Sequence, residues 1–257
     1  MAQLIPGVCS VTFRQLFAEE VIALVKQAGL ACIEWGGDVH VPHGDNNQAR
    51  YIRDKMDDAQ LTTAAYGSYY RVGESEAAGL NFADVLATAA CLGAPTVRVW
   101  AGSQGSDQAD EKYVQQVIED ATRIAKLAAV YDISVSFEFH RNTLTDTNKA
   151  ALELLQTCNH DNLYSFWQPP HYTSQTYRAE GLRALLPHLT NVHIFNWPEP
   201  GVRRPLVEAS APWQHYLEIV ASSSRTHPLL LEFVDQDSPA AFLRDAETLL
   251  GWLDDLG

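Results

Sequence analysis

Residues 134–147 read SVSFEFHRNTLTDT. The short run of β-branched and aromatic residues at its start, 134–139, carries one carboxylate, Glu138, near its end. A nearly continuous apolar run of this length is typical of a parallel strand that is buried on both faces. A carboxylate in such a strand costs free energy unless it has a partner, so Glu138 has few purely structural explanations. The stretch therefore indicates a parallel sheet with chemistry at the end of a strand.

Similar runs recur along the chain at a spacing of about 30 residues, which is the length of a repeated strand–helix unit. The predicted strands are residues 4–9, 31–35, 62–67, 96–100, 134–139, 163–167, 192–196 and 229–234. Apolar residues at helical spacing lie between them, at 17–28, 114–130, 149–157, 213–221 and 239–253. This pattern predicts a single-domain (β/α)₈ TIM barrel over residues 1–257. A doubly wound open sheet is the alternative, but no G-x-G-x-x-G motif follows the first strand.

Composition and charge narrow the classes of function. The chain has 257 residues, of which 46% are hydrophobic and 19% charged, as expected for a folded domain. Its formal net charge of −14 would repel a phosphate backbone, so we expect no nucleic-acid partner. No apolar run is long enough to cross a membrane, and the start, MAQLIPGVCSVTF, does not read as a secretory signal. We therefore expect no membrane association and a cytoplasmic location. The four cysteines lie far apart without metal-ligand spacing, and we interpret them as buried thiols.

Residues with metal-ligand chemistry fall at the ends of four consecutive predicted strands. They are Glu138, Gln168, His193 and Glu232. The chemistry of an α/β barrel lies at the C-terminal ends of its strands, so these side chains should converge on one point. Nitrogen and oxygen ligands that converge in this way suit one divalent cation. A buried core histidine is the alternative for His193, and a hydrogen bond to loop backbone is the alternative for Gln168.

Aromatic and polar residues near the strand ends are candidates for substrate binding. They are Trp35, His40, Tyr66, Arg98, Trp100, His140 and His171. Flat aromatic faces suit sugars, although large aromatic residues also fill cores. Arg98 has the alternative of pairing with a buried carboxylate, such as Glu34 or Glu138. The loop after the last predicted strand is acidic, which favours an unphosphorylated sugar, polyol or keto-acid, and the pair Arg203-Arg204 is the contrary observation.

These strand ends resemble the xylose isomerase-like barrel superfamily, which includes sugar-phosphate isomerases, ketose 3-epimerases, inosose dehydratases and AP endonucleases. The resemblance spans nearly the whole chain and also rests on EWGGDVHVP at 34–42, RVWAG at 98–102 and EFHRNTLTDT at 138–147. It implies one divalent metal ion, Mn²⁺, Mg²⁺, Co²⁺ or Zn²⁺, held by Glu138, Gln168, His193 and Glu232. The family's usual Asp-x-x-His reads Gln168-Pro-Pro-His171 here, and the lost negative charge should weaken metal binding.

The resemblance implies a metal-dependent isomerase or epimerase that acts on a small sugar, polyol or keto-sugar through an enediolate, with Glu138 and Glu232 as acid and base. Two alternatives stay open: an inosose-type dehydratase, in which the enolate expels a β-hydroxyl, and a non-catalytic sugar-binding barrel, which Gln168 suggests. An AP endonuclease-like hydrolase is disfavoured, because Tyr66, Trp100 and residues 196–200 stand where its additional metal ligands would be. The resemblance also implies a homodimer or homotetramer.

Overall fold

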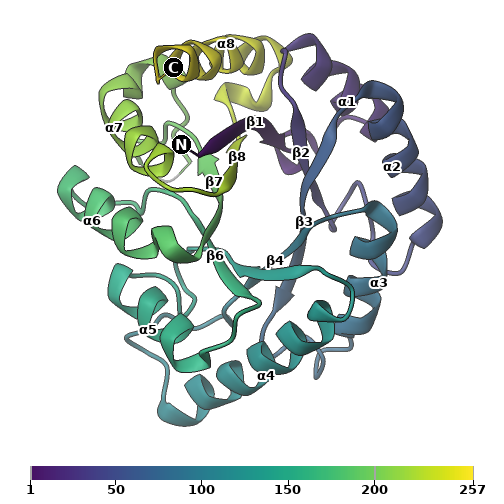
Figure 1. Ribbon diagram of the computed structural model, residues 1–257, viewed down its shortest axis with the longest axis vertical. Helices are drawn as coiled ribbons and strands as arrows, with labels where there is room; N and C mark the ends of the chain where they lie inside the picture. Colours follow the sequence, from purple (N-terminus) through teal and green to yellow (C-terminus); the bar gives the residue numbers. More distant parts are fainter. Residues whose placement is uncertain (1, 200, 257) are drawn as a thin grey trace.

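The computed structural model describes residues 2–199 and 201–256, and these form a closed barrel of parallel strands surrounded by helices (Figure 1). The strands are β1 (Gln3–Cys9), β2 (Cys32–Gly36), β3 (Thr62–Arg71), β4 (Thr96–Trp100), β5 (Ser134–Phe137), β6 (Leu163–Trp167), β7 (Leu189–Ile194) and β8 (Thr226–Leu231). The helices are α1 (Ala18–Gln27), α2 (Asn46–Ala59), α3 (Phe82–Leu92), α4 (Glu111–Ala129), α5 (Asn148–Cys158), α6 (Gln175–Leu185), α7 (Ser210–Ala221) and α8 (Pro239–Leu256). The predicted (β/α)₈ TIM barrel is confirmed.

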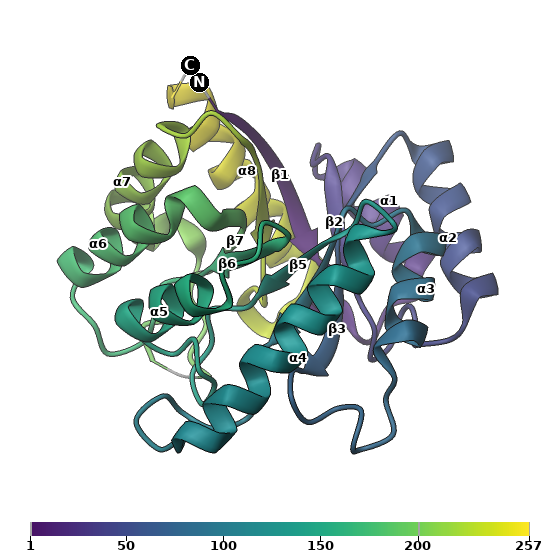
Figure 2. The same cartoon turned by 60° about the horizontal axis from the view of Figure 1, so that its bottom comes forward.

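Strand pairing follows the order of the chain, and the barrel closes between its first and last strands. β1 pairs in parallel with β8, in a register that runs from Gln3 opposite Thr226 to Val8 opposite Leu231. The helices pack around the outside of the strands (Figure 2). Closure of a parallel sheet brings the C-terminal ends of all its strands to one edge, which is where the loops that carry chemistry meet.

Local sequence signals explain where several helices begin and end. Asp45, Asp110, Thr147 and Ser174 each precede a helix, and each accepts a hydrogen bond from the backbone N–H three residues further on. Such caps satisfy backbone donors that the first turn of a helix leaves free. Gly93 ends α3 with a φ of 73°, a left-handed conformation that glycine adopts without strain.

Several strands end earlier or later than the sequence predicted, and these differences place the polar residues. Glu138, Gln168 and Glu232 are each the first residue after a strand, whereas His193 lies inside β7. The backbone N–H of Glu138 still donates to the carbonyl oxygen of Val99, and that of Glu232 to Ile194. The ladder hydrogen bonds thus continue for one residue past the strands and hold these side chains at the barrel rim.

The described part of the chain contains no helix that combines the length and the apolar character needed to cross a bilayer. Trp35, Trp167 and Trp213 are among its largest fully buried side chains. This continuous core fixes the strands that carry the polar residues described below.

Asp245 on α8 fixes the loop between β7 and α7. Its Oδ1 accepts a hydrogen bond from the backbone N–H of Leu206 at 2.9 Å, where the short 3₁₀ segment Leu206–Ala209 begins. Asp245 is only 6% exposed, and burial raises its pKa from 3.8 to about 6, although the hydrogen bond from Leu206 opposes this shift. At neutral pH the Asp245 carboxylate is therefore charged in a buried place, where a neutral hydrogen-bond acceptor would make the folded protein more stable.

We expect Asp245→Asn to remove this cost, because the amide oxygen can still accept from Leu206 and carries no charge. The folded pKa of Asp245 lies above its unfolded value, so its contribution to stability is greatest below pH 3.8 and is lost as the pH rises through 6. The free energy of unfolding of the variant, relative to wild type, should rise by about 2 kcal/mol between about pH 4.5 and 7.5. Urea denaturation at both pH values measures this, and a pH-independent difference would contradict it.

Candidate active site at the C-terminal rim of the barrel

Four polar side chains meet at the C-terminal edge of the barrel, around the ring of His193. Its Nδ1 atom lies 3.4 Å from Oε1 of Gln168 and 3.5 Å from Oε2 of Glu232. Oε1 of Glu138 lies 4.0 Å from the same nitrogen. His193, Glu138 and Glu232 are all buried. The structure therefore brings together all the side chains that the sequence predicted as metal ligands.

The donor set of this cluster fits a divalent cation. Glu138, His193 and Glu232 each offer one ligand atom, and these atoms lie within 4.8 Å of one another. Nε2 of Gln168 donates to the carbonyl oxygen of Phe139 at 2.7 Å, and because a carbonyl only accepts, the amide oxygen faces His193. One nitrogen and three oxygens that point at a common buried position form a set that hard and borderline cations accept.

Glu138 is held by donors on the side away from His193. Its Oε2 accepts hydrogen bonds from Nη1 of Arg98 and, at 2.5 Å, from Nε1 of Trp100. Burial alone would raise the pKa of Glu138, but the positive charge of Arg98 outweighs it and lowers the pKa to about 2. Glu138 is therefore ionised. Its Oε1 also has a partner, because Nε2 of Gln168 donates to it at 3.3 Å.

The pKa values of Glu232 and His193 are raised, whereas that of Glu138 is lowered. Burial raises the pKa of the Glu232 carboxyl, and His193 offsets this only in part. Burial would lower the pKa of His193, but Glu232 and Glu34 outweigh it and raise this pKa to about 9. The space at Nδ1 of His193 thus attracts positive charge, and a metal ion that binds there displaces the proton.

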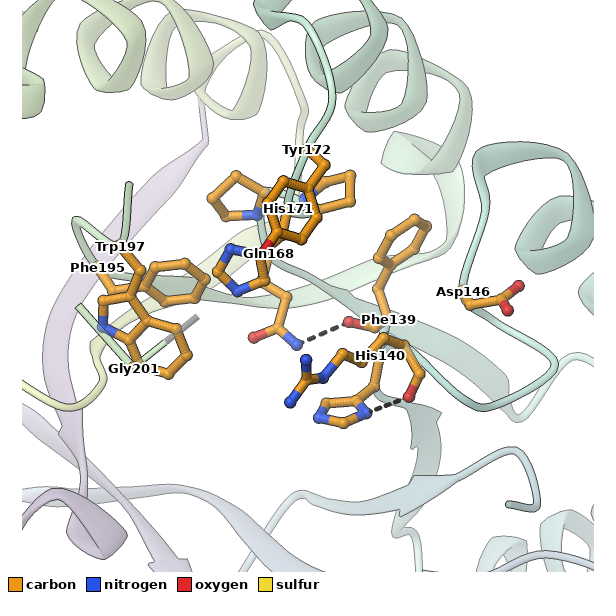
Figure 3. Close-up of a pocket in the computed structure, with 12 residues that line it drawn as sticks. Phe139, His140, Asp146, Gln168, His171, Tyr172, Phe195, Trp197 and Gly201 are labelled. Carbon is orange, nitrogen blue, oxygen red and sulfur yellow. Dashed lines mark hydrogen bonds between the residues drawn. The ribbon is translucent and has the colours of Figure 1, made fainter. Parts of the chain in front are cut away.

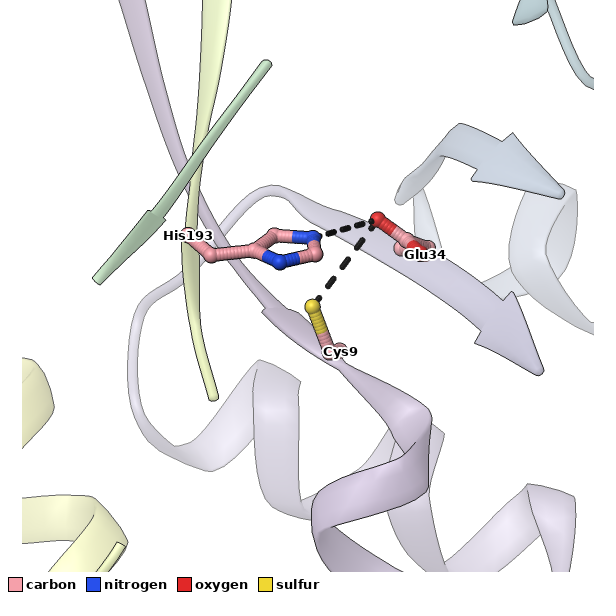
Figure 4. A group of neighbouring side chains, drawn as sticks. All are labelled: Cys9, Glu34 and His193. Carbon is pink, nitrogen blue, oxygen red and sulfur yellow. Dashed lines mark hydrogen bonds and ion pairs between the residues drawn. The ribbon is translucent and has the colours of Figure 1, made fainter. Parts of the chain in front are cut away.

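Glu34 lies on the other side of the His193 ring (Figure 4). Oε2 of Glu34 is 3.1 Å from Nε2 of His193, and Oε1 accepts from Nε of Arg98 at 2.6 Å. The thiol of Cys9 donates to Oε2 of Glu34 at 3.8 Å. Burial would raise the pKa of Glu34, but Arg98 and His193 lower it. Arg98 therefore pairs with both Glu34 and Glu138, which is the alternative role that the sequence left open for it.

Two adjoining cavities open over the cluster. The inner cavity has a volume of about 180 Å³ and is lined by residues that include Tyr69, Trp100, Glu138 and Glu232. The outer cavity, of about 240 Å³, includes Arg141, His171 and Phe195 in its wall (Figure 3). His140, Gln168 and Trp197 line both cavities, so the two cavities adjoin beside the predicted metal position.

His140 lies between the two cavities with one ring nitrogen free to act. Its ring stacks on Trp100, with the ring centroids 5.1 Å apart. Nδ1 of His140 lies 2.6 Å from the carbonyl oxygen of Arg141, an atom that only accepts, so Nδ1 carries a proton (Figure 3). In the neutral ring the lone pair is then on Nε2. This arrangement suits a proton acceptor at the cavity wall.

The predicted substrate-binding residues divide into two groups. Arg98, Trp100, His140 and His171 line the cavities. Trp35, Tyr66 and His40 are instead packed in the core, between β2, β3 and the neighbouring loops.

Local contacts explain why these three side chains turn away from the cavities. Trp35 is fully buried. The hydroxyl of Tyr66 donates to the carbonyl oxygen of Val41, and Nε2 of His40 lies 3.2 Å from that of Leu16. We therefore do not retain Trp35, Tyr66 and His40 among the substrate-binding candidates.

Sequence reasoning missed Tyr69 and Arg14, which line the inner cavity. The pairing of β3 with β4 is irregular between Gly67 and Tyr70, and Tyr69 adopts a φ of 54° in this irregular stretch. The hydroxyl of Tyr69 accepts from Nη2 of Arg14 at 3.2 Å. No hydrophobic pattern marks a bulge of this kind, whereas a search of the loop after the first strand would have found Arg14.

Comparison with known proteins gives a family and a set of similar folds. The family described as xylose isomerase-like TIM barrel matches residues 22–256. A 3-dehydroshikimate dehydratase of Bacillus anthracis is 37% identical over 67 residues, which are 26% of this chain and only 24% of that protein.

Solved structures with the same fold include proteins of different activity. The probable 3-dehydroshikimate dehydratase AsbF of Bacillus anthracis has a TM-score of 0.79 at 18% identity, over 97% of this chain and 99% of that one. A xylose isomerase-like TIM barrel protein of Mycobacterium smegmatis, in complex with magnesium, has a TM-score of 0.73 at 16% identity, over 97% and 96%. The D-psicose 3-epimerase of Clostridium cellulolyticum H10 has a TM-score of 0.71 at 14% identity, over 96% and 97%. At these identities the likeness shows the fold alone.

We expect Gln168→Glu to destabilise the metal-free protein, because the carbonyl oxygen of Phe139 loses its donor and faces a second acceptor. The loss should be about 1–3 kcal/mol in the free energy of unfolding, measured in the presence of a chelator. Added Mn²⁺ should reduce the difference in the free energy of unfolding between the variant and wild type, because the negative charge of Glu at position 168 favours a bound cation. Gln214→Glu, at an exposed position on α7, is the control. Equal stability of Gln168→Glu and wild type in chelator would contradict the assigned amide orientation.

Proposed function

Because the chain belongs to the xylose isomerase-like TIM barrel family, we propose that the cluster around His193 is an active site that holds one divalent metal ion. The proposed ligands are Glu138, Gln168, His193 and Glu232. A cation held there would polarise the oxygens of a bound carbonyl and hydroxyl and so acidify the neighbouring C–H bond. The convergence of three buried ligand atoms within 4.8 Å supports the site.

The reaction we propose is a dehydration rather than an epimerisation. The observation that carries this proposal is the hydrogen bonding of Glu138, whose Oε2 is held by Arg98 and Trp100. Inversion of a carbon needs a proton acceptor on one face and a donor on the other. With Oε2 held by two donors and Oε1 proposed to face the metal ion, Glu138 is a poor proton acceptor, which disfavours the pair of Glu138 and Glu232 for an inversion. An elimination needs a single base.

His140 is the base that we propose. Its Nε2 carries a free lone pair at the wall shared by both cavities. The imidazole takes the proton from the carbon next to the substrate carbonyl, and the electron pair of that C–H bond forms the enolate. The enolate then expels the β-hydroxyl, which accepts the same proton from the His140 imidazolium and leaves as water. His140 returns to its neutral form, so the balance of the step is the loss of one water molecule.

The proposed substrate is a small cyclic keto acid, for which 3-dehydroshikimate, named in the Bacillus anthracis relative, is the first candidate. Arg141 lies on the outer cavity, and the ion pairs among residues 2–199 and 201–256 do not include it. An unpaired cation at the rim of a protein with a formal net charge of −14 favours an anionic substrate. Loss of water from 3-dehydroshikimate, followed by tautomerisation, gives the aromatic 3,4-dihydroxybenzoate, which makes the elimination strongly favourable.

We expect the purified chain to convert 3-dehydroshikimate to an aromatic acid in the presence of Mn²⁺, which the ultraviolet absorbance of the product reports. Removal of the metal with a chelator should abolish the reaction, and added Mn²⁺ should restore it. Exchange of substrate hydrogen with deuterated water, without loss of water, would instead favour an epimerase. Purified protein that takes up no metal would favour a non-catalytic barrel.

We expect His140→Asn to lower kcat by about 100- to 10,000-fold, the usual effect of removing a general base. The Asn amide can still donate to the carbonyl oxygen of Arg141, so the loop conformation should be kept. His215→Asn is the matched control, because His215 is exposed on α7. Full activity of His140→Asn would remove His140 from the mechanism and leave Glu232 as the candidate base.

A further inference from the structure

Glu34 is a buried carboxylate of the cluster that the proposed reaction does not use. It is 2% exposed, and it is not among the residues that line the two cavities. Its oxygens face two different members of the site, with His193 on one side and Arg98 on the other. We propose that Glu34 is a positioning residue, which selects the nitrogen that His193 presents to the metal ion and anchors the Arg98 that holds Glu138. This inference rests on the metal site proposed above.

The contact between Glu34 and His193 determines the tautomer of the ring. An ionised carboxylate accepts hydrogen bonds and does not donate them, so the 3.1 Å contact requires a proton on Nε2 of His193. When the ring is neutral, the lone pair is therefore on Nδ1. Nδ1 is the atom that faces Gln168, Glu138 and Glu232. A carboxylate behind a ligating histidine also makes the other ring nitrogen a stronger donor to a metal ion.

The contact between Glu34 and Arg98 orients the second arm of the site. A guanidinium group is planar, permanently charged and presents its donors in a fixed fork. Nε of Arg98 donates to Oε1 of Glu34, while Nη1 of the same group donates to Oε2 of Glu138. Because the guanidinium group is rigid, the hydrogen bond to Glu34 also fixes the direction in which Nη1 points toward Glu138. Oε2 of Glu138 is thereby occupied, and Oε1 is left on the side of His193.

The isosteric variant Glu34→Gln tests the inference because an amide cannot satisfy both partners in the same way. Arg98 has only donors, so it should take the amide oxygen. The amide NH₂ then faces Nε2 of His193 and donates to it. His193 must accept at Nε2 and carry its proton on Nδ1, the atom proposed to bind the metal. Glu34→Gln should therefore invert the tautomer without changing the size of any side chain.

The experiment measures the affinity for Mn²⁺ by calorimetry in wild type, Glu34→Gln and the control Glu119→Gln, which is exposed on α4. We expect Glu34→Gln to bind Mn²⁺ about 10- to 100-fold more weakly, the usual effect of losing such a partner, and the control to match wild type. The tautomer of His193 is measured by nuclear magnetic resonance on Zn²⁺-loaded protein labelled with ¹⁵N-histidine, in which the signals that disappear in His193→Gln are assigned to the His193 ring. These signals should show a proton on Nε2 in wild type and a changed ring state in Glu34→Gln.

The outcomes separate this inference from the proposed function. Wild-type protein that binds no Mn²⁺ overturns the metal site and the inference together. Wild-type protein that binds Mn²⁺, with equal affinity in Glu34→Gln, overturns the positioning role alone. Glu34→Asp covers the case in which Glu34→Gln does not fold, because it keeps the charge beside Arg98. Its side chain is one methylene too short to reach both partners, so we expect at least about 3-fold weaker Mn²⁺ binding, and unchanged affinity overturns the inference.

Discussion

The guanidinium of Arg98 is a buried cation between two buried carboxylates, Glu34 and Glu138, and the rest of the rim is organised around it. Ions removed from water are costly unless close partners and hydrogen bonds satisfy them. Arg98 reaches both carboxylates because Gly67 on β3 leaves room for it. A Cβ atom at position 67 would lie 2.6 Å from Nη2 of Arg98 and 2.8 Å from Oε1 of Glu34.

The charges of the cluster also bear on Gln168, the neutral residue that directly follows β6. Glu34, Glu138 and Glu232, when ionised, outnumber Arg98 by two negative charges, which one divalent cation would balance. An aspartate in place of Gln168 would add a further negative charge to this total. Glu34 on β2 is the carboxylate on the other side of the His193 ring. In the proposed site, a neutral amide at position 168 is consistent with a balanced total charge.

The sequence correctly predicted which polar residues meet at the ends of the last four strands. Glu138, Gln168, His193 and Glu232 meet because adjacent parallel strands deliver their ends to one edge. The same reasoning did not hold on β2 and β3. Tyr66 lies in the core and Tyr69 lines the cavity, because the irregular pairing of β3 with β4 shifts which residue reaches the rim. A bulge of this kind depends on the partner strand, which periodicity does not describe.

The sequence by itself determined the barrel and the four polar residues that follow or end its last strands, Glu138, Gln168, His193 and Glu232, because hydrophobic period, caps and strand ends are local properties of the chain. Only the tertiary structure decided how those residues divide their hydrogen bonds. Glu34 and His193 are 159 residues apart in the chain, and Glu34 and Arg98 are 64 apart. Which oxygen of Glu138 is engaged, and which nitrogen of His193 faces the other ligands, follows from contacts between distant strands. These contacts exist only once the barrel has closed, so no local pattern could specify them.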